Sequence, residues 1–111
     1  LCQDKSPQGG DVHLMIGNQD SHLAAVTEAA ASVREQLGNK RPQFVLIFES
    51  LLRYRLLRRA AGQVSTIIQD IFGADVPLLG MYSWGEFVTV KGPGGANTVV
   101  QNGNITIMAI E

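Results

Sequence analysis

A continuous apolar run near the middle of the chain constrains the fold more than any other feature. Residues 44–48 read Phe-Val-Leu-Ile-Phe, and the run lies between Pro42 and the polar pair Glu49 and Ser50. Such a short run with these boundaries is typical of a central strand that is covered on both faces. It is far too short to cross a bilayer. We therefore expect a sheet built around this strand.

Helical periodicity flanks the run on both sides. The first helix is predicted after the candidate N-caps Asp20 and Ser21 and before Gly38, which suits a helix C-terminus. The second helix is predicted to stop at Gly73. The apolar residues at helical spacing are Leu23, Val26, Ala30, Val33 and Leu37 in the first helix, and Leu57, Ala60, Ala61, Val64, Ile67, Ile68, Ile71 and Phe72 in the second.

Other short apolar segments predict further strands. These are residues 11–17 (with Val12, Leu14, Met15 and Ile16), 76–81, 87–90 and 104–110, with 98–100 as a candidate extension of the pairing. The resulting order is β-α-β-α-β-β-β. Strand–helix–strand units favour parallel pairing, and the closely spaced last strands favour an antiparallel meander. The predicted fold class is α/β of the mixed α+β type, with a single mixed sheet of about five strands and two helices.

Composition fits one small domain. The chain has 111 residues, of which 45% are hydrophobic and 17% charged, so intrinsic disorder is not expected. Residues 1–10 are predicted to be a flexible lead-in, and 11–111 a single domain. The net charge of −1 offers no basic field for nucleic acid, and no segment has the length of a membrane span. Because Cys2 is the single cysteine, we expect a reducing, cytoplasmic location. Leu1 in place of methionine suggests a piece of a longer multidomain protein.

The segment after the central strand is the first candidate site. In open α/β sheets ligands bind beyond the carboxyl ends of strands, where Glu49, Ser50 and Arg53 fall. An arginine cluster begins there. Cations at a helix N-terminus are unfavourable because they oppose the helix dipole, whereas a bound anion would interact favourably with both the arginines and the free backbone N–H groups. A carboxylate or phosphate ligand is therefore one interpretation. The alternative is a solvated face whose arginines pair with Glu49 or Asp70, or with nothing. The cluster comprises Arg53, Arg55, Arg58 and Arg59.

The second candidate site is the segment 80–86, Gly-Met-Tyr-Ser-Trp-Gly-Glu. Its glycines allow a sharp turn or close approach of a ligand, and Tyr82 and Trp84 supply flat apolar walls with one donor each. Glu86 is placed to receive an ammonium group. The alternative is a hairpin turn with core aromatics and an exposed or arginine-paired glutamate.

Other polar residues carry weaker signals. His13 and His22 lack partners at metal-ligand spacing, so we expect no metal. The glycine-rich stretch 92–95 lacks the Lys-Ser/Thr end of a phosphate loop, and no cofactor is predicted. Ser50 has no adjacent base in sequence, so no catalytic residue is assigned.

Taken together, these segments resemble the C-terminal half of the FIST domain, the FIST C family. The family pattern has a strand ending in Phe-Ser-Cys-x-x-Arg, a strand running into Gly-Phe-Tyr-x-x-Gly-Glu, and a closing strand after an Asn-containing turn. Residues 48–53 keep the phenylalanine and arginine of the first part, and residues 80–86 keep the glycines, Tyr82 and Glu86 of the second. Asn102 stands in the third. One departure is that Glu49-Ser50 replaces Ser-Cys, so a role that needs a thiol is absent.

The resemblance implies an intracellular sensory module for signal transduction that binds small molecules, with amino acids as the proposed ligand class. It also implies two partners, an N-terminal FIST half and an output signalling domain. Such domains occur beside histidine kinases, chemoreceptors and cyclic-dinucleotide enzymes in bacteria, and with F-box domains in eukaryotes. The predicted ligand-binding residues are Glu49, Ser50, Arg53, Tyr82, Trp84, Glu86 and Asn102. We expect Arg53 to hold a ligand carboxylate and Glu86 an ammonium group. The alternatives are a protein–protein interaction module with no ligand and, less favoured, a hydrolase using Ser50 or Glu49 with Glu86.

Overall fold

The computed structural model describes residues 8–11 and 17–111, except for the side chain of Lys91. Residues 12–16 of the strand predicted over residues 11–17 lie outside the described residues. The remaining elements are three α-helices, one short 3₁₀ helix and five strands, and the mixed α+β class is confirmed. None of the helices described is long and apolar enough to span a membrane.

The first predicted helix is confirmed as α1, Gln19–Leu37. Its N-cap is Asn18, two residues before the earlier of the predicted caps, because the Asn18 side chain accepts a hydrogen bond from the Ser21 N–H at 2.8 Å. Ser21 returns the contact, since its hydroxyl oxygen accepts from the Asn18 N–H at 3.1 Å. This reciprocal pair satisfies two backbone donors of the helix start. The helix ends at Gly38, as predicted, with a backbone φ of 60°.

The second predicted helix is divided into three segments. Helix α2, Leu51–Leu57, starts directly after the central strand, and a short 3₁₀ segment, η1, Arg58–Gly62, leads into α3, Gln63–Phe72. The break lies at Arg58, which has a φ of 51° and so cannot continue an α-helix. Gly73 ends α3 with a φ of 112°, as the sequence predicted. The arginine cluster therefore spans two helical segments.

The apolar run forms the central strand β1, Phe44–Ser50, of a three-stranded sheet with the order β2-β1-β5. Strand β2, Leu78–Ser83, lies parallel to β1, and β5, Ile105–Ile110, lies antiparallel on its other side. Ile47 is opposite Gly80 in β2 and Ile107 in β5, and opposed residues share a face of the sheet.

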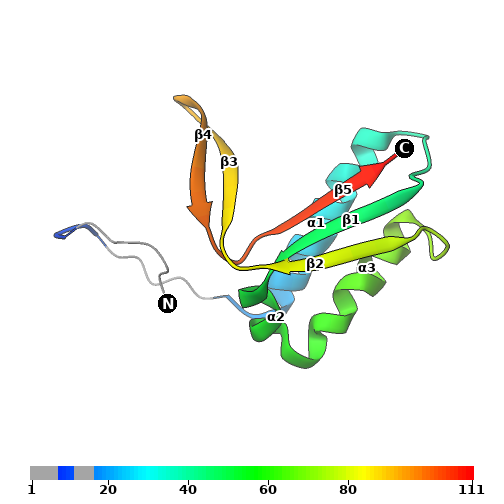
Figure 1. The fold of residues 1–111 in the computed structure, drawn as a ribbon, viewed down its shortest axis with the longest axis horizontal. Coiled ribbons are helices and arrows are strands. Elements are labelled where there is room, and N and C mark those ends of the chain that lie inside the picture. The colour runs from blue at the N-terminus through cyan, green and yellow to red at the C-terminus, as the bar shows by residue number, and fades with distance from the viewer. Residues whose placement is uncertain (1–7, 12–16) are drawn as a thin grey trace.

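The prediction of one sheet with a closing meander is wrong in this detail. Strands β3, Glu86–Gly92, and β4, Gly95–Gln101, pair only with each other and form a separate hairpin that projects from the body (Figure 1). The chain segment 98–100, a candidate extension, is part of β4. The physical reason is that β2 and β5 pair with the two edges of β1, so neither edge of β1 is left for β3 or β4. Strand β5 pairs with β1 through six residue pairs whose members lie far apart in the sequence.

The helices cover one face of the sheet, with α1 and α3 packed behind it (Figure 1). Side chains alternate along β1, so Val45, Ile47 and Glu49 face the helices and are buried. The opposite face is open, and Phe44 at its edge is 37% exposed. The expectation that β1 is covered on both faces is therefore wrong for one of them. The buried core consists of Val26, Ala30, Val45, Ile47, Leu57, Ala60, Val64, Ile68, Phe72, Val76 and Ile107.

Candidate functional site

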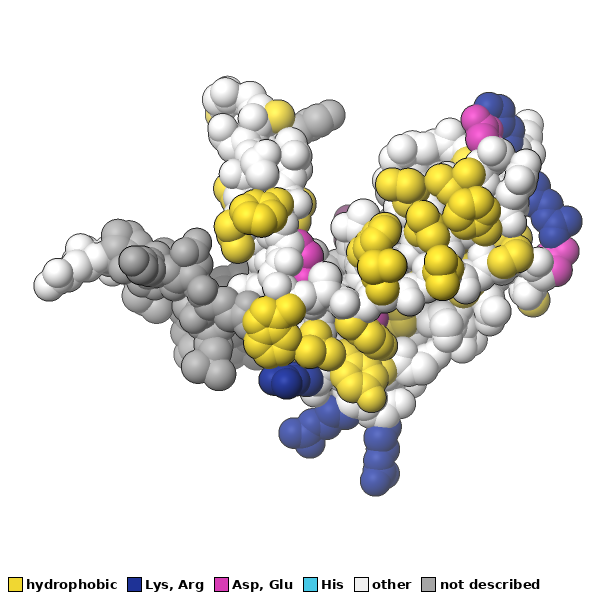
Figure 2. Space-filling model, viewed as in Figure 1, with side chains coloured by type: hydrophobic (Ala, Val, Ile, Leu, Met, Phe, Trp, Pro, Cys, Tyr) yellow, Lys and Arg dark blue, Asp and Glu magenta, His cyan; other side chains and the backbone are white. Residues whose placement is uncertain are grey.

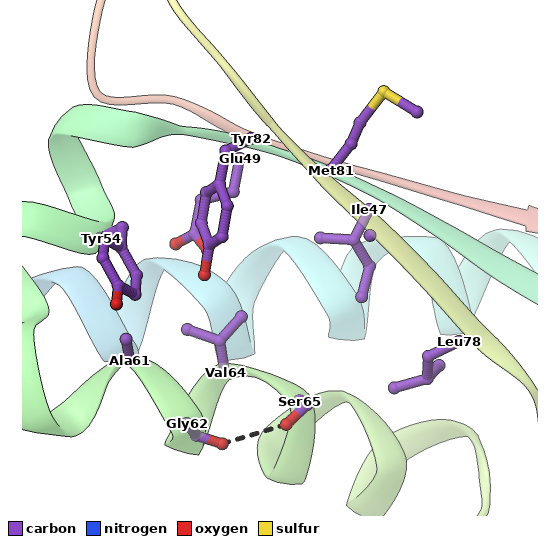
Figure 3. Close-up of a pocket in the computed structure, with 11 residues that line it drawn as sticks. Ile47, Glu49, Tyr54, Ala61, Gly62, Val64, Ser65, Leu78, Met81 and Tyr82 are labelled. Carbon is purple, nitrogen blue, oxygen red and sulfur yellow. Dashed lines mark hydrogen bonds between the residues drawn. The ribbon is translucent and has the colours of Figure 1, made fainter.

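A cavity of about 430 Å³ lies between the sheet and the segments α2, η1 and α3. Figure 3 shows it bounded above by β1 and β2 and below by the helical segments. We call it the sheet–helix cavity. Its lining residues are Ile47, Glu49, Tyr54, Ala61, Gly62, Val64, Ser65, Leu78, Gly80, Met81 and Tyr82.

Glu49 is the one charged residue of this lining. It is on the helix-facing side of β1 because it follows Val45 and Ile47 at the strand period of two. Its Oε1 accepts a hydrogen bond from Nε of Arg53 at 3.1 Å, and the two side chains are only 6% and 4% exposed. The Arg53 guanidinium also donates to the backbone oxygen of His22 at 2.8 Å, which ties α2 to α1. The pair thus joins the strand to two helices.

The four arginines of the cluster do not form one shared anion-binding site. Arg53 is buried and its Nε and Nη2 groups donate within the protein, whereas Arg55, Arg58 and Arg59 are exposed. Pairing of the cluster with Glu49 was one of the alternatives that the sequence left open, and Arg53 adopts it.

Two tyrosines stand beside Glu49. Tyr82 is opposite Glu49 in the β1–β2 register, and its ring centroid lies 5.0 Å from that of Tyr54 in α2, with the rings tilted by 57°. Burial raises the pKa of the Tyr82 hydroxyl, and the negative charge of Glu49 and the neighbouring Tyr54 raise it further. Figure 3 shows both rings and the carboxylate at the same end of the cavity, above Ala61 and Val64. Polar groups therefore converge at one end of an otherwise apolar space.

The opposite part of the cavity is formed by aliphatic side chains. Ile47 and Leu78 line it, and Ser65 on α3 donates its hydroxyl hydrogen to the Gly62 backbone oxygen at 3.0 Å (Figure 3). A cavity with one polar end and aliphatic walls suits a small molecule that has a charged or hydrogen-bonding end and an apolar part.

A second, smaller cavity of about 250 Å³ lies where α2 meets the corner between β2 and β3. Ser50, which caps α2, lies in its lining together with Trp84 and Asn102. The Arg55 guanidinium stacks 5.2 Å from the Trp84 ring centroid, a cation–π contact at the rim. The remaining lining residues are Leu52, Ser83 and Gly85.

Glu86 lines neither cavity. Its Oε1 accepts a hydrogen bond from the Ser83 hydroxyl at 2.7 Å, across a turn in which Gly85 has a φ of 84°. Its Oε2 is buried and has no hydrogen-bond partner among the described residues. The carboxylate therefore helps to hold the corner from which the hairpin departs.

The structure thus distributes the predicted site residues among separate places. Glu49 and Tyr82 share the sheet–helix cavity, while Ser50, Trp84 and Asn102 share the smaller one. Arg53 lies behind Glu49 as its ion-pair partner. Sequence reasoning missed Tyr54, although it lies one helical turn after Ser50, the spacing that places a residue above its helix cap. It also missed Val64, Ile47 and Leu78, because apolar residues within predicted helices and strands indicate core positions. Among the residues that the structure describes, no group of three His, Cys, Asp or Glu side chains is placed to hold a metal ion.

Comparison with known proteins agrees with the resemblance noted from the motifs. The family model described as the FIST C domain matches residues 1–89, which include β1, the helical segments, β2 and the first part of β3. Asn102 and the closing strand β5 follow the matched range. No curated protein and no solved structure matches the chain. On this match, the chain belongs to the FIST C family, whose members are generally sensory domains for signal transduction.

Proposed function

We propose that this chain is the ligand-binding part of a sensor and that it binds an amino acid or a similarly sized amine-carboxylate in the sheet–helix cavity. The observation that carries the proposal is the Glu49 carboxylate at the cavity end. Arg53 donates to one of its oxygens, and no described residue donates to the other. The volume of about 430 Å³ falls within the range of about 300–1,000 Å³ that is usual for small-molecule sites.

Glu49 is suited to an ammonium group. The Glu49–Arg53 pair has no net charge, but the carboxylate is the member that lines the cavity. Burial raises the pKa of the Tyr82 hydroxyl, and the negative charge of Glu49 raises it further. A ligand cation at this end gains a charge-assisted contact in a partly desolvated place.

The remaining lining is suited to the other parts of an amino acid. The hydroxyl groups of Tyr54 and Tyr82 are donors for a carboxylate, and Ile47, Val64 and Leu78 offer an apolar wall for a side chain. This arrangement differs from the sequence-based hypothesis, in which Arg53 binds the carboxylate and Glu86 the ammonium group. It is favoured because Arg53 already donates to Glu49 and His22, and Glu86 accepts from Ser83.

A thermal-shift screen against the common amino acids, small amines and small carboxylates tests the proposal. A ligand at 100 times its Kd stabilises a protein by about 2.7 kcal/mol, a readable rise in melting temperature for a domain of this size. We expect selective shifts from compounds that carry both an amine and a carboxylate. Isothermal titration then gives the affinity of each compound that shifts the melting temperature.

Three variants then locate the site. Gly80→Val adds a side chain at a residue that lines the cavity, and the added Cβ meets Ile47 atoms at 3.7 Å, an ordinary van der Waals contact. We expect Gly80→Val and Glu49→Gln each to weaken binding at least about tenfold, the effect of losing roughly 1.4 kcal/mol of contact. Glu86→Gln is the matched control, because Glu86 lies outside the cavity. Parent-like affinity in folded Gly80→Val contradicts the proposal, and loss of binding in Glu86→Gln alone supports the sequence-based assignment instead.

A further inference from the structure

The face of the sheet that the helices leave uncovered is almost entirely apolar. On β1 this face carries the side chains that alternate with the buried Val45 and Ile47. Residues of β2 and β5 that lie opposite these side chains share the same face of the sheet. Figure 2 looks onto this face and shows hydrophobic side chains gathered over the sheet. Figure 3 shows Met81 pointing away from the helices. We call this surface the open face. It consists of Phe44, Leu46, Phe48, Leu79, Met81, Met108 and Ile110.

Several of these side chains are largely exposed. Leu79 is 61% and Met81 55% exposed, and Met108 on the other edge strand is 47% exposed. A sheet with parallel pairing is normally covered on both faces, and a contiguous apolar surface of this kind marks an interface. Leaving it in water costs roughly 25 cal/mol for each Å² of apolar area.

The distribution of charge favours a second copy of the chain as the cover. None of the seven residues of the open face is charged. The polar residues that alternation and register place on the same face are neutral as well: Thr106, opposite Phe48, and the opposed pair Ser50 and Ser83. In a two-fold dimer the same surface patch faces itself across the interface. A patch of one charge sign would therefore face the same sign on the other copy and be repelled. This face has no such repulsion. The nearby cations Lys40 and Arg41 are paired with Glu111 and Asp75.

The available area also fits a dimer. Hydrophobic side chains on the β3–β4 hairpin lie on the same side of the molecule as the open face (Figure 2). Phe87, at 82% exposure, and Val100 are opposite each other in this hairpin. With the open face they expose an apolar area on the order of 700 Å², close to the ~800 Å² that each partner contributes to a stable interface.

We infer that two copies of this chain pack open face to open face and form a symmetric homodimer. The two sheets then stack at the usual spacing of about 10 Å, with helices on the outside of both. The sheet–helix cavity lies on the other side of β1 and β2 and stays accessible in each copy. This inference does not depend on the ligand proposed above, since no residue of the open face other than Met81 lines that cavity.

Sedimentation velocity between about 2 and 200 µM tests the inference. The parent is expected to reach twice the chain mass of 12.0 kDa, and Leu79→Glu and Met108→Lys are expected to be monomers. Each variant places an unpaired charge from both copies in the interface, which weakens association by more than about 100-fold. Leu56→Lys is the matched control: Leu56 is an exposed leucine on α2, outside the open face, and its variant is expected to dimerise as the parent does. Circular dichroism checks that each variant is folded.

Methyl NMR of the parent provides a second measurement that needs no substitution. The Met81 and Met108 methyl signals are expected to shift on dilution through the dissociation range. A parent that is monomeric at 200 µM overturns the inference and leaves the face to another domain or protein. Larger, open-ended aggregates overturn it too. So does a dimer that persists in both charge variants, since another surface then forms it.

Discussion

Glu49 at the end of β1 and Arg53 in α2 form an ion pair whose side chains are both almost completely buried. The pair joins the central strand to the helix that follows it, and the Arg53 contact with the His22 backbone extends the connection to α1. It therefore has a structural role in addition to the proposed ligand contact, and the two roles need separate measurements.

Removing one member of this pair is expected to destabilise the fold. Arg53→Met leaves the buried Glu49 carboxylate without its cation, and such losses cost about 3–5 kcal/mol. The double variant Glu49→Leu/Arg53→Met leaves no unpaired charge and is expected to be more stable than Arg53→Met alone. Urea unfolding of the parent, both single variants and the double variant gives the coupling free energy. Additive effects of the two substitutions would show that the pair contributes no interaction.

The pKa of Tyr82 is expected to depend on Glu49. Burial raises this pKa above its ordinary value of 10.0, and the Glu49 charge adds to the effect. Because the folded state holds the proton more tightly, stability is fully present below about pH 10 and falls as the pH rises above it. Ultraviolet titration of tyrosinate in a Tyr54→Phe background, with and without Glu49→Gln, measures the shift. Glu49→Gln is expected to lower the pKa, and an unchanged value would place the carboxylate away from Tyr82.

The Arg41–Asp75 pair at the surface is expected to shift a pKa without large effect on stability. The hydrogen bond from Arg41 holds the pKa of the Asp75 carboxyl below its ordinary value, and a backbone hydrogen bond and the Arg41 charge act in the same direction. The small stabilisation is present above the unfolded-state pKa and is lost as the pH falls through the folded-state value. Carboxyl NMR titration of Arg41→Ala is expected to show that the pKa of Asp75 rises toward its ordinary value. Lys40→Ala is the control, since Lys40 pairs with Glu111.

Two adjacent leucines of α2 are expected to respond very differently to truncation. Leu57 is fully buried in the core, whereas Leu56 is 47% exposed. Leu57→Ala removes buried methyl groups and leaves a cavity, for an expected loss of about 2–5 kcal/mol, while Leu56→Ala should stay within about 0.5 kcal/mol of the parent. Equilibrium unfolding of both variants measures the difference. Equal losses would mean that α2 is turned relative to the sheet.

The elements with strong local signals were predictable from the sequence. Helix α1 and its end at Gly38 follow from apolar periodicity and a glycine whose positive φ costs little, and the end of α3 at Gly73 has the same cause. The apolar run of residues 44–48 predicts the central strand β1 because its short length and its flanking Pro42 and polar residues are typical of a strand. These signals are local, so they are readable before the chain folds.

The break at Arg58 and the separation of the hairpin were not predictable in this way. Arg58 has no sequence feature that marks a positive φ; the backbone turns there where Leu57 enters the core. The pairing of β5 with β1 joins residues about sixty positions apart, and it decides that β3 and β4 pair only with each other.

The candidate site shows the same division. The sequence by itself determined which chemical groups are present near the end of β1, among them Glu49, Arg53 and Tyr82, and it led to the family to which the chain belongs. Only the tertiary structure decided that Arg53 faces Glu49, that Tyr82 shares a cavity with Glu49, and that Glu86 does not. The physical reason is that side-chain direction follows strand alternation and register, and register depends on contacts between segments far apart in the chain.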